Sequence, residues 1–120
     1  MMPDISLPGQ EVDLMKVLVI PDIHLKTWIF DRAENIMKDG KADRAVCLMD
    51  IPDDWGMEFQ IELYRKTFDR AIAFAKAYPN TLWCYGNHDI SYPWGELESG
   101  YSPYAGLLQV LPNWKNLKEP

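Results

Sequence analysis

Three short apolar segments, at residues 16–20, 45–49 and 81–85, each run directly into a turn rich in polar side chains. Two longer segments lie between them, at 27–38 and 57–78, and their apolar residues recur every three or four positions. Short apolar runs are typical of strands buried on both faces, whereas the longer spacing is typical of amphipathic helices. The chain therefore alternates between strand and helix, which indicates the α/β class.

The boundaries of these segments carry recognisable signals. Thr27 or Asp31 can start the first helix, and Gly40 follows it as a stop. Phe59 and Leu63 begin the apolar stripe of the second helix, which Pro79 ends. Strand–helix–strand connections within one sheet are almost always right-handed and make the strands parallel. We therefore predict an α/β fold, a βαβαβ parallel sheet with flanking helices.

The ends of the chain show weaker patterns. Residues 1–15 contain two prolines, one glycine and three acids, and we expect them to form a flexible leader. They lack the basic and apolar regions of a secretory signal. Residues 16–120 would then form one domain, with a loop over 86–106 where glycine and proline are frequent.

Composition restricts the class of function. The chain is 48% hydrophobic and 25% charged, the balance of a soluble globular protein. Its net charge is −6 and no run of Lys or Arg occurs, so the usual electrostatic signature of a nucleic-acid binder is missing. No apolar stretch approaches the roughly 20 residues that span a bilayer, so we expect no membrane association. Cys47 and Cys84 lie inside apolar runs, and we interpret them as buried free thiols of a cytoplasmic protein.

Each predicted strand ends in side chains that are suited to metal binding or catalysis. In chain order these are Asp22, His24, Asp50, Asp53, Asn87 and His88. Ligands of open α/β sheets bind at the carboxyl ends of the strands. Three parallel strands would therefore bring the three turns together at one edge of the sheet.

The residue types suggest a division of roles. Asp22 and His24 are two residues apart, a spacing that points both side chains the same way in extended backbone. A carboxylate oxygen and an imidazole nitrogen suit Mn, Fe or Zn better than Ca or Mg. Asp50 could bridge two ions, and Asn87 could give its amide oxygen to the second ion. His88 would project differently from Asn87, towards a substrate.

Each of these residues also has an ordinary structural explanation. Asp22, Asp50 or Asn87 alone could cap a helix or close a turn, and histidines are often surface or core residues. Receiver-like and nucleotide-binding α/β domains also carry acids at strand ends, but the chain has no G-x-G-x-x-G loop. The metal-site interpretation therefore rests on the whole constellation, since both histidines of the chain lie in these turns.

The three turns together resemble those of the calcineurin-like metallophosphoesterases. That family shows D-x-H, then GD-x-x-D, then GNH followed by Asp or Glu, each after a strand. Here the turns read DIH at 22–24, MDIPD at 49–53 and GNHD at 86–89. The matching stretch runs from about Lys16 to Asp89. The resemblance implies the first half of a two-sheet sandwich that hydrolyses phosphate esters.

The resemblance also implies a set of metal ligands. Asp22 and His24 would bind the first metal, Asp50 would bridge both metals, and Asn87 would bind the second. The cofactors would be two divalent ions, with Mn favoured and Fe or Zn as alternatives.

The remaining two residues would serve the reaction itself. His88 would be the catalytic histidine near the leaving-group oxygen, and Asp53 would hold and orient it. A hydroxide bridging the metals would attack phosphorus in line. The substrate would be a phosphate-ester small molecule or a nucleotide.

Three departures from the family pattern have consequences. Met49 replaces the usual Gly before the bridging Asp, and Asp54 stands where the phosphatase branch often has Arg. No histidine follows His88, whereas the family completes its site with later histidines. Three alternatives stay open: a missing C-terminal part, ligands from another chain as in a homo-oligomer, or a degenerate non-catalytic relative that binds metal weakly.

Overall fold

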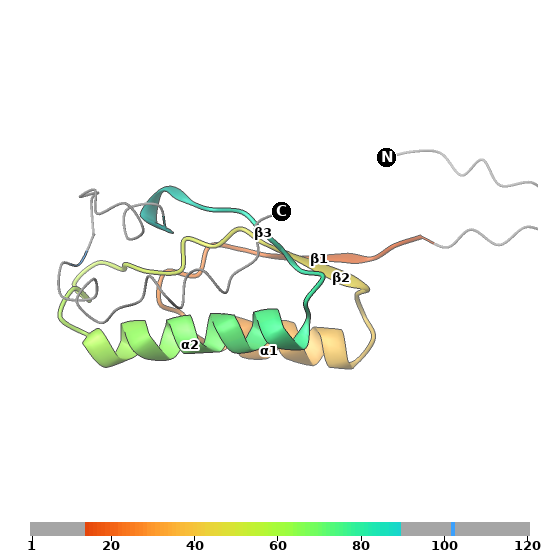
Figure 1. Cartoon of the computed structure of the whole chain (residues 1–120), viewed down its shortest axis with the longest axis horizontal. Helices are drawn as coiled ribbons and strands as arrows, with labels where there is room; N and C mark the ends of the chain where they lie inside the picture. Colours follow the sequence, from red (N-terminus) through yellow and green to blue (C-terminus); the bar gives the residue numbers. More distant parts are fainter. Residues whose placement is uncertain (1–13, 90–101, 103–120) are drawn as a thin grey trace, which may run out of the picture.

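The computed structural model describes residues 14–89 and residue 102. They contain a three-stranded parallel sheet in the order β1-β2-β3 (Figure 1). The strands are β1 at Val17–Ile20, β2 at Arg44–Cys47 and β3 at Leu82–Trp83. The predicted α/β class with parallel strands is therefore confirmed.

The register aligns the carboxyl ends of the strands. Ile20, the last residue of β1, pairs with Cys47 at the end of β2, and Cys47 pairs with Trp83 at the end of β3. The turns that follow the strands consequently start from the same edge of the sheet, as the sequence predicted.

Two helices, α1 at Trp28–Lys38 and α2 at Ile61–Ala77, cover one face of this sheet (Figure 1). Two right-handed crossovers that advance in the same direction across a sheet place both helices on the same face. The helices bury one side each against the sheet, through Phe30 and Ala33 of α1 and a longer row on α2. That row is Tyr64, Thr67, Phe68, Ala71, Phe74 and Ala75.

An aromatic cluster forms the centre of the core. The ring of Phe30 lies 5.8 Å from that of Phe74 and 6.3 Å from that of Trp83, measured between centroids. Ile20 and Cys47 are buried beside it, on the face of the sheet that carries the helices. On the other face Val17, Val19 and Leu82 are exposed, which matches the two-residue periodicity of a strand.

Polar contacts join the two helices. The Thr27 hydroxyl lies 2.7 Å from the buried hydroxyl of Thr67, which itself donates to the Leu63 carbonyl. Arg70 of α2 forms ion pairs with Asp31 at 2.9 Å and with Glu34 at 3.0 Å, both on α1. These pairs fix the spacing of α1 and α2 on the sheet.

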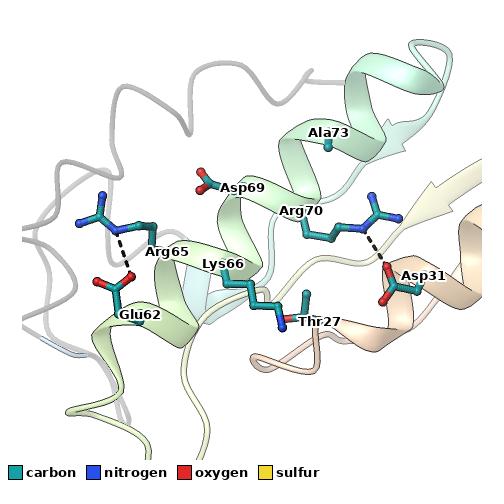
Figure 2. Close-up of a pocket in the computed structure, with 8 residues that line it drawn as sticks. All are labelled: Thr27, Asp31, Glu62, Arg65, Lys66, Asp69, Arg70 and Ala73. Carbon is teal, nitrogen blue, oxygen red and sulfur yellow. Dashed lines mark hydrogen bonds and ion pairs between the residues drawn. The ribbon is translucent and has the colours of Figure 1, made fainter.

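Figure 2 shows a hollow that the two helices form around the Arg70–Asp31 pair. Its lining is Thr27, Asp31, Glu62, Arg65, Lys66, Asp69, Arg70 and Ala73. The three acidic and three basic side chains balance in charge, so this hollow offers no preference for an anion or a cation. Its lining includes none of the predicted site residues.

One predicted helix boundary requires correction. The second helix begins at Ile61 and not near residue 57, because Gly56 has a φ of +75° and the Met57 amide donates to the Asp54 carbonyl in a turn. Phe59 is therefore outside the helix and 73% exposed. Thr27 does occupy the position before α1, but its side chain bonds to Thr67 and makes no capping bond.

Several other expectations concern the ends of the chain. Residues 1–13 of the expected leader, and nearly all of the expected loop at 86–106 beyond residue 89, lie outside the described residues. Among the described residues, neither helix has the length and apolar character that crossing a membrane requires. Both cysteines are free as predicted, but only Cys47 is buried, since Cys84 follows β3 on the exposed side.

Candidate metal centre

The first two turns are joined by backbone hydrogen bonds that extend the pairing of β1 and β2 past the strand ends. The amides of Ile23, His24 and Leu25 donate to the carbonyls of residues 49, 50 and 51, at 2.9, 2.7 and 2.9 Å. This run of bonds brings His24 level with Asp50. Backbone hydrogen bonding between the two chain segments thus continues from the sheet into the site.

The third turn is attached to the second by Asp89. Its Oδ2 accepts hydrogen bonds from the amides of Asp50 at 2.7 Å and Gly86 at 2.6 Å, and its Oδ1 accepts from the amide of Ile51 at 2.9 Å. The side chain is fully buried, and burial raises the pKa of the Asp89 carboxyl to about 7 although the three amide bonds lower it. One carboxylate therefore fastens two turns together.

Asp89 is a residue whose function the sequence prediction missed. It is part of GNHD at 86–89, where the sequence pattern gives it no role of its own. The available signal was its position, an acid directly after three residues that close a strand-end turn. What it does became evident only from the convergence of three amides on one side chain.

Left-handed backbone is concentrated in the first two turns. The non-glycine residues with positive φ are His24, Leu25, Met49, Asp50 and Asp53, and their φ angles lie between +42° and +68°. Such conformations cost energy in L-residues and tend to cluster at functional sites. Met49 has a φ of +59°, which explains why glycine suits this position in the family pattern.

Asp22, His24 and Asp50 form a cluster with the chemistry of a metal site. His24 Nε2 lies 3.9 Å from Asp22 Oδ2 and 4.0 Å from Asp50 Oδ2, and all three ligand atoms lie within 4.8 Å of one another. Asp22 is exposed, His24 half-buried and Asp50 buried, so the cluster opens to solvent on one side. These are three of the four predicted metal ligands.

The backbone fixes which nitrogen of His24 can bind an ion. Nδ1 lies 2.9 Å from the carbonyl oxygen of Asp53 and 3.3 Å from that of Pro52. A carbonyl only accepts, so Nδ1 must carry a proton, and in the neutral imidazole the lone pair is then on Nε2. That lone pair belongs to the nitrogen that faces the two carboxylates, as metal-binding histidines require.

Asp50 uses its two oxygens in different directions. Oδ2 is near His24, whereas Oδ1 accepts a hydrogen bond of 3.0 Å from the amide of His88 in the third turn. Gly86 packs so close to this carboxylate that an added Cβ would overlap Asp50 Oδ1. The fourth predicted ligand, Asn87, lies exposed between Gly86 and His88 in the same turn.

His88 and Asp53, the predicted catalytic pair, are in contact. His88 Nδ1 lies 3.1 Å from Asp53 Oδ2, and the carboxylate is 2% exposed. Because a carboxylate accepts, Nδ1 donates and Nε2 of His88 is left for another partner. The His88 ring meets that of His24 edge-on, with centroids 5.2 Å apart, so the pair adjoins the metal cluster.

Tyr64 is a second residue that the sequence prediction missed. Its hydroxyl donates to Asp53 Oδ1 at 2.8 Å, on the opposite oxygen to His88. Tyr64 occupies an ordinary core position of α2, and its sequence context carries no signal of a polar role. Asp54 also has a partner, since its Oδ2 lies 3.4 Å from Lys26 Nζ at the rim of the site.

The donor set fits a divalent cation. Two carboxylates and one imidazole nitrogen lie within 4.8 Å of one another, and Lys26 at the rim of the site is paired with Asp54. Mutual repulsion between the carboxylates would be relieved by a bound cation. Oxygen and imidazole ligands together are typical of Mn, Fe and Zn.

A comparison with protein-family models agrees with this geometry. The model described as Calcineurin-like phosphoesterase matches residues 15–119, which is most of the chain. No curated protein and no solved structure gives a match. The chain therefore belongs to the calcineurin-like phosphoesterase family.

Proposed function

We propose that this chain hydrolyses phosphate esters in a metal-dependent reaction. The observation that carries the proposal is that the Asp22, His24 and Asp50 cluster directly adjoins the His88–Asp53 pair, with the two imidazole rings 5.2 Å apart. Family membership supports the same class of reaction. The substrate is a small phosphate ester or a nucleotide.

Two divalent ions, with Mn favoured, would be held by the residues of the three turns. Asp22, His24 and Asp50 would hold the first ion, and Asp50 with Asn87 would hold the second. Asp50 is suited to bridging because its two oxygens face different turns. When bound, the ions would supply positive charge for the phosphate oxygens and lower the pKa of a water molecule.

His88 would serve as the acid for the leaving group. Its Nδ1–H is held by Asp53, so its ring orientation is fixed and Nε2 can carry a proton to the departing alkoxide oxygen. His88 is 19% exposed at its side chain, which leaves it accessible from the open side of the cluster.

The test is hydrolysis of an alkyl phosphate such as glycerol phosphate with and without added Mn²⁺. We expect activity to require the ion and to fall by about 10²–10⁴-fold in His88→Ala, the range for loss of a general acid. Asp69→Ala removes an exposed acid of the hollow in Figure 2 and should keep full activity. Equal rates with and without metal would refute the proposal.

The non-catalytic alternative predicts a different combination of results. A chain that only binds metal would give a Mn²⁺ binding isotherm with no turnover of any phosphate ester. A chain that needs a second copy for its ligands would show activity that rises with the square of protein concentration at low concentration. Light scattering at the concentrations of the assay separates these two outcomes.

A further inference from the structure

We propose that Tyr64 is a positioning residue, which orients His88 through Asp53. This inference rests on the proposed function for its kinetic test, but not for its spectroscopic test. Tyr64 is linked to the site by the hydrogen bond from its hydroxyl to Asp53. Its effect would pass entirely through the carboxylate of Asp53.

The geometry is a chain of three side chains. The Tyr64 hydroxyl donates to Asp53 Oδ1 at 2.8 Å, and Asp53 Oδ2 accepts from His88 Nδ1 at 3.1 Å. Tyr64 is fully buried, and Asp53 is 2% exposed. The two oxygens of one carboxylate are therefore held from opposite sides by two different elements, α2 and the turn after β3.

A carboxylate needs such a second contact in order to orient a histidine well. Rotation about its terminal torsion is broad, so a single hydrogen bond leaves the plane of the oxygens loosely defined. Asp53 also has a φ of +68°, a conformation that its surroundings must maintain. The Tyr64 hydroxyl fixes the carboxylate plane, and with it the direction of the His88 ring.

The position of Tyr64 suits this purpose. It lies in the first turn of α2, eleven residues after Asp53, and its aromatic ring is fully buried as part of the hydrophobic core. A hydroxyl carried by a rigid, buried ring moves less than one on a flexible side chain. A side chain anchored in the core thus holds the Asp53 carboxylate at the edge of the site.

The kinetic test uses Tyr64→Phe, which keeps the ring and removes the donor. If His88 is misoriented, protonation of the leaving group suffers, so a poor leaving group is affected more than a good one. We expect kcat for an alkyl phosphate such as glycerol phosphate to fall about tenfold or more, and kcat for p-nitrophenyl phosphate to change less than about threefold. Tyr78→Phe, at the far end of the same helix, should leave both rates unchanged. An equal loss with both substrates would indicate a merely structural role and would overturn the proposal.

The second test does not depend on activity or metal. The chain has two histidines, so its Nδ1–H protons are few enough to resolve by ¹H–¹⁵N NMR of the imidazoles. In Tyr64→Phe we expect the His88 Nδ1–H signal to move or to exchange faster with water, while that of His24, which bonds to backbone carbonyls, stays in place. An unchanged His88 signal would overturn the proposal even in a chain that has no activity. If the wild-type chain shows no turnover, only the proposed function fails.

A further variant covers the case in which Tyr64→Phe does not fold. Incorporation of 3-fluorotyrosine at position 64 keeps the ring and the hydroxyl but makes the hydroxyl a stronger donor. The stronger bond to Asp53 has to shift the His88 Nδ1–H resonance, whereas the same replacement at Tyr78 should not. Identical His88 spectra for both replacements would contradict the proposed coupling.

Discussion

Oδ2 of Asp89 lies 2.7 Å from the backbone amide of Asp50, and this contact joins the turn after β3 to the turn after β2. The same carboxylate also holds the amides of Ile51 and Gly86. An acid outside the predicted ligand set thus determines where the central ligand, Asp50, stands. The first prediction follows from this arrangement.

Asp89→Asn should destabilise the protein and loosen the site. The asparagine side chain has one acceptor oxygen where the carboxylate has two. Its NH₂ group would face backbone N–H donors, which would then lack an acceptor. Buried groups left unpaired in this way cost about 2–4 kcal/mol in total. Urea unfolding measures this free energy, and Asp69→Asn on the exposed face of α2 should change it by less than about 0.5 kcal/mol. Equal stability of the two variants would contradict the account of Asp89.

Gly86→Ala should impair metal binding more than folding. A Cβ at Gly86 would overlap Asp50 Oδ1, so the carboxylate has to move. We expect the affinity for Mn²⁺ to fall by about tenfold or more, as for displaced ligands elsewhere. Gly40→Ala is the control, because Gly40 also restricts substitution through a φ of +68° but a Cβ there meets no atom within 4 Å. It should lower stability by about 1 kcal/mol without changing the affinity for Mn²⁺.

Met49 gives a test of the left-handed backbone. It is fully buried, so Met49→Ala should cost about 2–5 kcal/mol through the cavity it leaves. Met49→Gly leaves a similar cavity but relieves the φ of +59°, and should be roughly 1 kcal/mol more stable than the alanine variant. Ala45→Gly in β2 should show the opposite sign, because glycine weakens an ordinary strand. If Met49→Gly is less stable than Met49→Ala, the backbone at position 49 is not strained.

The two cysteines should differ sharply in reactivity. Burial raises the pKa of the Cys47 thiol to about 12, while Cys84 is exposed. Because the reactive species is the thiolate, at pH 9 only about one thousandth of Cys47 is reactive. We expect one fast reaction with a disulfide reagent in the native protein and a second one only in urea. Cys84→Ser should remove the fast reaction, and two fast reactions in the wild type would show that Cys47 is accessible.

Much of the fold could be predicted because its signals are local. The runs at 16–20 and 45–49 have the apolar character of buried strands, and each is followed by a polar turn. Parallel strands with right-handed crossovers then bring those turns together. The start of α2 was wrong because the turn through Gly56 continues a helical spacing of apolar residues without helical backbone.

The gathering of three side chains at the strand ends could be predicted, whereas the contacts that support them could not. Asp22, His24 and Asp50 come together as the strand ends require. The roles of Asp89 and Tyr64 depend on single hydrogen bonds between residues far apart in the sequence. Asp89 bonds to Ile51, 38 residues away, and Tyr64 bonds to Asp53, 11 residues away. The spacing of apolar residues carries no information about such contacts. The tautomer of His24 likewise follows from a carbonyl of the second turn.

The most direct test of the central claim is a Mn²⁺ titration of the metal-free protein, followed by the EPR signal of the free ion. The wild type should bind Mn²⁺ with defined stoichiometry. Asp22→Ala and Asp50→Ala should each weaken binding by about tenfold or more, while Asp69→Ala should leave it unchanged. The same affinity in all four proteins would mean that the cluster at the strand ends is not a metal centre.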